Sequence, residues 1–97
     1  MIDQFVPEAI DEVVQAVNFL NAQVKGLGNA FYEAVDSAIA LIKEHPTQWP
    51  VVVGEVRRYR LKRFKYHVVY QVHGDVLLII AVSHTSRRSG YWLDRLR

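Results

Sequence analysis

The chain of 97 residues contains no cysteine, and it is poor in proline and glycine, with three and five residues respectively. The absence of cysteine excludes disulfide bonds and thiolate metal sites, and it is typical of proteins in a reducing compartment. The longest wholly apolar run, residues 76–82, is far shorter than the ~20 residues that span a bilayer. No basic segment followed by an apolar stretch opens the chain, so we expect no signal peptide, no membrane contact and a cytoplasmic location.

Charge is divided unevenly along the chain. Residues 1–56 carry two cations and eight acids, whereas residues 57–97 carry ten cations and two acids; the net charges of −6 and +8 sum to the overall +2. A chain of this length forms one domain, residues 1–97, and that domain is expected to have a basic face. Such a face is typical of a site for a polyanion or an acidic protein. The alternative is a solvated surface whose charges serve solubility.

Hydrophobic periodicity predicts two helices near the N-terminus. A short opening strand over residues 1–7 is stopped by Pro7. Apolar residues then recur at helical spacing over about 8–25 and again over about 29–44, with glycines between the two segments. His45-Pro46 ends the second segment, because a residue before proline avoids the α region. We therefore expect an antiparallel helical hairpin.

Strand patterns dominate the rest of the chain. Three strands are predicted at about 55–64, 66–73 and 76–84, after a proline-bounded connection over 46–54. The last strand is apolar on both faces, so we expect it to be the most buried. A short helix is predicted from Tyr91. The fold class is thus α+β, in the order β-α-α-β-β-β, with a small antiparallel sheet and the helical hairpin packed on one face.

The densest positive charge lies on a predicted strand rather than in a flexible tail. Five of the nine residues in 56–64 are lysine or arginine, and none is acidic. Strand alternation places Arg58, Arg60 and Lys62 in one row, about 6 to 7 Å apart, which roughly matches successive phosphates of a nucleic acid. We interpret the row as a fixed polyanion-binding surface. The alternative is an edge strand that uses charge to block aggregation.

Further chemistry-bearing side chains follow the buried strand directly. Histidine, arginine and tyrosine together suit cleavage of a phosphodiester, which needs a base, stabilisation of charge at phosphate, and an acid. The candidate residues in this segment are His84, Arg87, Arg88 and Tyr91, and His67, near the start of the middle strand, is placed to face the same cleft. His84 is also compatible with a purely structural role. We predict no metal site and no cofactor, because the histidines lack close pairing with carboxylates.

Five ordered segments cover nearly the whole chain: PEAIDEV, AFYEAVDSAIALIKEHP, VRRYRLKRF, YHVVYQVHGDVLLIIAVSH and RRSGYW. In this order and spacing they resemble the RelE/ParE superfamily of type II toxin–antitoxin toxins, also called plasmid stabilisation proteins. The resemblance implies a small sheet with two helices on one side. It also implies a growth-inhibiting toxin and a cognate antitoxin whose segment wraps and neutralises it.

The resemblance leaves the mechanism divided between two branches. RelE-type members cut messenger RNA on the ribosome without a metal; by motif, Arg60 and Lys62 match their basic strand positions, Arg87 the phosphate-stabilising arginine and Tyr91 the tail tyrosine. The sequence departs from that pattern at His67, where an arginine is usual. ParE-type members instead inhibit DNA gyrase, and the AVSH strand end is similar to theirs.

The sequence alone thus supports three hypotheses. We place a metal-independent, ribosome-dependent mRNA endoribonuclease first, because most of the basic-plus-tyrosine set that the resemblance implies is present. In that hypothesis the predicted catalytic residues are Arg87, Tyr91, Lys62 and His84, and the predicted phosphate-binding residues are Arg58, Arg60, Arg88 and His67. A non-enzymatic inhibitor of DNA gyrase is the alternative. The third hypothesis is an inactive member that only binds its antitoxin.

Overall fold

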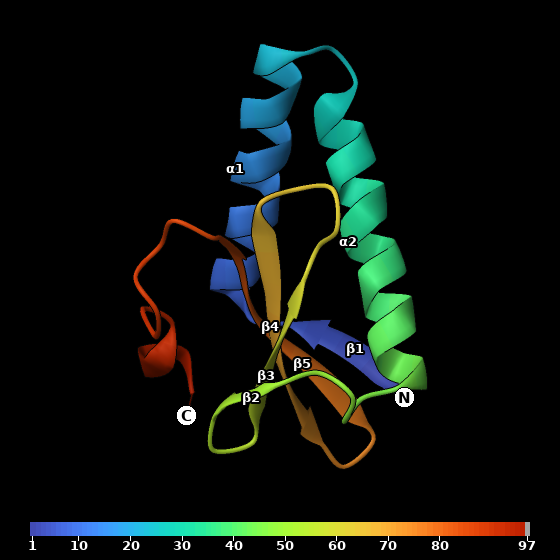
Figure 1. Cartoon of the computed structure of the whole chain (residues 1–97), viewed down its shortest axis with the longest axis vertical. Coiled ribbons are helices and arrows are strands. Elements are labelled where there is room, and N and C mark those ends of the chain that lie inside the picture. The colour runs from blue at the N-terminus through green and yellow to red at the C-terminus, as the bar shows by residue number, and fades with distance from the viewer. Residues whose placement is uncertain (97) are drawn as a thin grey trace.

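The computed structural model describes residues 1–96 as two helices and a five-stranded sheet, arranged in layers (Figure 1). The elements are β1 (Ile2–Phe5), α1 (Pro7–Gln23), α2 (Leu27–Glu44), β2 (Val51–Val53), β3 (Val56–Arg60), β4 (Tyr66–His73) and β5 (Val76–His84). The α+β fold class predicted from the sequence is confirmed. Within the described residues, no helix is long and apolar enough to cross a membrane.

Local sequence explains the helical hairpin. Pro7 occupies the start of α1, where its missing N–H costs no hydrogen bond. Gly26, between the helices, has a φ of 85°, a conformation that residues with a side chain rarely adopt. Gly28 lies so close to α1 that a Cβ in its place would come within 2.1 Å of the Val17 carbonyl oxygen. Its amide donates to Asn21 Oδ1 at 2.7 Å. The helices therefore approach closely at this end because residue 28 has no side chain.

The sheet is mixed rather than purely antiparallel, which corrects one detail of the prediction. Its strand order is β1-β5-β4-β3-β2; β1 pairs parallel to β5, and the other neighbours pair antiparallel. The helical hairpin separates β1 from the other strands in sequence and allows it to run beside β5 in the same direction. β5 consequently lies inside the sheet with a neighbour on each side, and it is buried along most of its length, as predicted.

The edge strand β2 lies within the segment predicted to be a connection. Three valines follow Pro50 here and pair with β3, with a register irregularity. A proline is tolerated at the start of an edge strand because no ladder hydrogen bond is lost there. The prediction was wrong because it gave Pro46 and Pro50 more weight than the three β-branched residues that follow them.

The basic strand is shorter than predicted. β3 ends at Arg60, and residues 61–65 form the link to β4. Leu61 and Phe64 are both buried in the core beneath the helices, although strand alternation would send positions three apart to opposite faces. The chain turns to bury both, so Lys62 does not continue the row of Arg58 and Arg60 along the strand.

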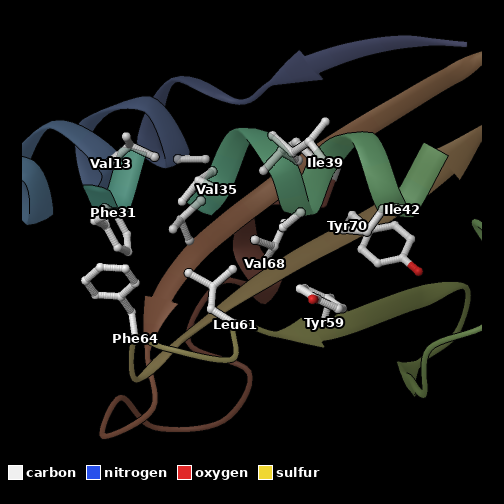
Figure 2. Packing of buried hydrophobic residues seen from close by; sticks show 14 of the residues in the cluster. Val13, Phe31, Val35, Ile39, Ile42, Tyr59, Leu61, Phe64, Val68 and Tyr70 are labelled. Carbon is white, nitrogen blue, oxygen red and sulfur yellow. The ribbon is translucent and has the colours of Figure 1, made fainter. Parts of the chain in front are cut away.

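The main core lies between the helices and the sheet. Phe31 of α2 meets the edge of Phe64 at 5.3 Å between ring centroids and lies 4.7 Å from Tyr66, and Figure 2 shows α2 side chains facing Leu61 and Val68 across this layer. We call this cluster the helix-side core; its buried members are Ala9, Val13, Ala16, Phe31, Val35, Ala38, Ile39, Ile42, Tyr59, Leu61, Phe64, Val68, Tyr70, Leu77, Ile79 and Val82.

A smaller cluster covers the opposite face of the sheet. Trp92, 3% exposed, packs there with Val56, Val69, Ile80 and Ala81, and we call this set the tail-side cluster. Trp92 belongs to the segment after β5, which lies on the α1 side of the molecule (Figure 1). The predicted C-terminal helix from Tyr91 is a single 3-10 turn, Leu93–Arg95. Burial of Trp92 against the sheet holds this segment in a turn rather than a longer helix.

Candidate functional site

The sheet face opposite the helices carries a group of cations. Arg58 and Arg60 alternate on β3 with Tyr59, which points into the helix-side core. Across the sheet, Arg60 pairs with His67 on β4, and His67 pairs with Ser83 on β5. With the residues that follow β5, these side chains form what we call the basic face: Arg58, Arg60, His67, Arg87 and Arg88.

Two adjoining hollows mark the basic face. The first, of about 120 Å³, has a lining that includes Arg58, His67, His84, Arg87 and Arg88. The second, of about 370 Å³, has a lining that includes Trp49, Arg58, Arg60, Lys62 and His67. The structure thus brings four of the predicted site arginines and His67 around two hollows that share Arg58 and His67. Lys62 lines the second hollow, whereas Arg87 lines the first.

His67 lies among these cations in partly buried surroundings. Burial lowers the pKa of its imidazole below the ordinary value of 6.5, and the charges of Arg58 and Arg60 lower that pKa further. At pH 7 the side chain is therefore neutral. It can exchange hydrogen bonds with a ligand here, but it adds no charge to the basic face.

His84 has a structural role that the geometry defines. Its Nδ1 accepts the backbone N–H of Ser86 at 3.0 Å and lies 2.8 Å from the Ser86 hydroxyl. Its ring also meets the edge of Tyr66 at 5.1 Å between centroids. These contacts fix the turn after β5, which carries Arg87. Among the residues that the structure describes, no three His, Asp or Glu side chains are grouped so as to hold a metal ion.

Tyr91 lies in a third hollow, of about 210 Å³, between α1 and the end of β5, whose lining includes Glu12, Phe19, His84, Arg87 and Tyr91. The Tyr91 hydroxyl donates a hydrogen bond to Glu12 Oε2. Burial raises the pKa of Tyr91 to about 12, with further contributions from this hydrogen bond and the Glu12 charge. The guanidinium of Arg87 lies 3.9 Å above the Tyr91 ring.

Glu12 and Arg95 complete this arrangement, and neither was among the predicted site residues. Arg95 donates to both carboxylate oxygens of Glu12, at 2.9 and 3.1 Å, and to the Ile80 carbonyl at 3.0 Å. Glu12 also accepts the backbone N–H of Val82 at 3.0 Å. The ion pair therefore satisfies backbone groups of β5 beyond the point where β1 ends.

A sequence signal for Glu12 does exist. Ala9, Val13 and Ala16 form the buried stripe of α1, and residue 12 lies beside that stripe at helical spacing. A carboxylate at the margin of a buried stripe needs a partner. Acids are common in the first turn of a helix, where the helix dipole favours them, so Glu12 alone gave no indication that Arg95 would lie close by.

Comparisons with known proteins agree with one another. A family model described as the ParE toxin of the type II toxin–antitoxin system parDE matches residues 4–89. A solved structure described as the chromosomal ParDE toxin–antitoxin system from P. aeruginosa is similar in fold. Its TM-score is 0.64 at 16% identity, and the match covers 87% of this chain and 95% of that one. No curated protein sequence matches significantly.

Proposed function

Because this chain belongs to the ParE toxin family of type II toxin–antitoxin systems, we propose that it arrests growth as a non-enzymatic inhibitor of DNA gyrase. In this proposal the toxin grips its target through the basic face and the segment after β5. This order reverses the one that the sequence favoured, in which mRNA cleavage came first.

The observation that carries the proposal is the state of Tyr91. A tail tyrosine that transfers a proton needs a hydroxyl free to reach the substrate and a pKa that lets it ionise. Here the hydroxyl is bonded to Glu12, and the pKa is raised to about 12. Lys62, the other residue assigned to cleavage, lines a different hollow from Arg87 and Tyr91. This arrangement favours binding over proton transfer.

The basic face itself suits binding. Arg58, Arg60, Arg87 and Arg88 are all exposed, so their guanidinium groups are available to carboxylates or phosphates. The backbone of each arginine is held by β3 or by the segment that follows β5. This lowers the entropy lost when a partner orders the side chains. A partly exposed aromatic side chain, Trp49, lies beside Arg58 and Arg60. Arginine and aromatic side chains together are typical of the centre of a protein interface.

A cognate antitoxin is the second partner in the proposal. The outer surface of α1 exposes apolar side chains, with Ile10 at 49%, Val14 at 51% and Phe19 at 60%. Together with the basic face they offer apolar anchors and positive charge to one wrapping segment, which would bring apolar and acidic side chains. In the proposal, the antitoxin neutralises the toxin by covering surface that the target needs.

A supercoiling assay with purified gyrase and relaxed plasmid tests the proposal. The wild-type toxin is expected to inhibit supercoiling, and the Arg87→Ala variant to need a concentration about tenfold higher or more. Lys25→Ala, which removes one charge at the tip of the helical hairpin, is the matched control and is expected to inhibit like the wild type. Growth arrest with normal supercoiling would contradict the proposal.

One observation favours the mRNA endoribonuclease as a second candidate. The first hollow has arginines from β3 and from the segment after β5, and a neutral histidine between them. That set could surround a phosphate and supply a base. Primer extension on cellular transcripts after a short pulse of expression distinguishes the candidates. New cuts inside translated codons, absent with Arg87→Ala, would support cleavage, whereas intact transcripts would exclude it.

A further inference from the structure

We propose that Glu12 is a positioning residue for target binding, which acts through the Tyr91 hydroxyl to set the place of Arg87. The inference rests on the proposed function, because it takes Arg87 as part of the surface that meets the target. It assigns a role to a residue of α1 that lines the third hollow together with Tyr91 and Arg87.

The Glu12 carboxylate is held from several directions. Its side chain is only 15% exposed, and it accepts four hydrogen bonds, from the Val82 N–H, from two nitrogens of Arg95 and from the Tyr91 hydroxyl. Val82 is 1% exposed and belongs to the buried strand β5, so the carboxylate is tied to the backbone of the sheet. A group fixed in this way has little freedom to change its orientation.

The Tyr91 ring transmits that position to Arg87. The hydroxyl end of Tyr91 is fixed by Glu12, and its backbone N–H donates to the Arg88 carbonyl at 3.2 Å. A ring held at both ends presents one face in a constant direction. The Arg87 guanidinium lies over the ring at 3.9 Å, within the range of a cation–π contact. Arg87 is otherwise exposed, so this contact defines where its charge points.

A purely structural role for Glu12 is the competing explanation. Its bonds to Arg95 and Val82 attach the C-terminal segment to β5 whether or not Arg87 matters. The two roles make different predictions for Tyr91→Phe, which removes one hydroxyl and leaves both the ring and the Glu12–Arg95 pair in place. If Glu12 positions Arg87, loss of the hydroxyl should weaken inhibition of the target through Arg87. If Glu12 is only structural, loss of the hydroxyl should lower the stability of the toxin and leave inhibition unchanged.

The experiment is a double-mutant cycle on the full-length toxin. Gyrase inhibition is measured for the wild type, Tyr91→Phe, Arg87→Ala and the combination of both, with thermal unfolding of each protein recorded. We expect Tyr91→Phe to raise the inhibitory concentration by about threefold to tenfold, and we expect this loss to vanish when Arg87 is already alanine. Glu12→Gln, measured in the same two backgrounds, should behave in the same way, although it also weakens the Arg95 pair.

Each outcome decides a separate question. If Tyr91→Phe inhibits like the wild type while Arg87→Ala is impaired, the positioning role is overturned and the proposed function stands. If Tyr91→Phe causes the same loss with and without Arg87, it acts through the fold, and the inference is again overturned. If Arg87→Ala inhibits like the wild type, gyrase inhibition stands but Arg87 is not part of the surface that meets the target, and the inference is overturned. If the wild type itself leaves supercoiling unchanged, the proposed function fails, and the inference fails with it. Tyr91→Phe keeps the test decisive even where Glu12→Gln does not fold.

Discussion

The two faces of the sheet are built in opposite ways. The helix-side core is a continuous set of apolar side chains from α1, α2 and three strands, and it contains no charged residue. The opposite face buries Trp92 against four other side chains, and it carries exposed arginines. Apolar burial supplies most of the stability of a small domain. The comparison teaches that one face supplies most of the buried apolar surface, which leaves the other free to carry exposed charge.

Removal of Phe31 should cause the largest loss of stability. Phe31 is fully buried between the helices and the sheet, so Phe31→Ala should lower the free energy of unfolding by about 4 kcal/mol. Chemical denaturation measures this. Tyr32→Ala is the control, because the neighbouring ring is 59% exposed and its loss should cost less than about 0.5 kcal/mol. Equal losses at the two positions would contradict the assignment of the core.

The second-largest loss of stability is expected where α1 and α2 approach each other closely, at Gly28. Gly28→Ala places a methyl group against the backbone of α1, and about 2 to 3 kcal/mol of stability should be lost. Gly26→Ala is the matched control. It enters open space and carries only the left-handed backbone cost of about 1 kcal/mol. A larger loss at Gly26 than at Gly28 would show that the turn, and not the helix contact, limits stability.

The ion pair between Glu12 and Arg95 tests how the C-terminal segment is attached to β5. Arg95→Met keeps side-chain length but leaves Glu12 with one cation fewer and the Ile80 carbonyl without its donor. We expect a loss of about 2 kcal/mol in the free energy of unfolding, below the range for fully buried pairs because both side chains retain some exposure. Arg63→Met, an exposed site in the β3–β4 link, should change stability little. Hydrogen exchange should speed up in the segment after β5 and remain slow in α2.

The smallest effect concerns pH. The pKa of His67 is lowered in the folded state, so the unfolded chain binds the proton more tightly. Stability should therefore fall as the pH drops through and below 6.5, and it should be regained as the pH rises. His67→Gln should flatten this part of the curve, as measured by unfolding at a series of pH values. A profile as steep in the variant as in the wild type would assign the dependence to other groups.

Most of the fold could be predicted from the sequence because its signals are local. Helical spacing of apolar residues, the glycines of the hairpin and the doubly apolar strand β5 each specify their element without reference to distant residues. The pairing of β1 with β5 could not be predicted in the same way, since it depends on which strand edge remains open after the meander forms. The early end of β3 was missed because the sequence pattern assigns Leu61 and Phe64 to the strand. Only the tertiary structure shows that both side chains enter the core beneath the helices.

The candidate site was predictable only in part. The clustering of arginines follows from charge and strand order, and the structure brings Arg58, His67, Arg87 and Arg88 around one hollow. The partner of Tyr91 could not be foreseen. Glu12 lies 79 residues away in sequence, and only the tertiary fold places its carboxylate beside the tyrosine hydroxyl. Roles that depend on such distant contacts are those that a linear pattern describes least well.

The place of β5 in the sheet has a consequence during synthesis. β5 lies between β1 and β4, yet it is the last of the five strands to leave the ribosome, and Glu12 meets Arg95 across 83 residues of sequence. Contacts of such long range are slow to form. A nascent chain that has emerged only as far as β4 has no partner for β1, and it lacks Arg87 altogether. The basic face, which needs β5 and the arginines that follow it, is therefore assembled only when synthesis of the chain is almost finished.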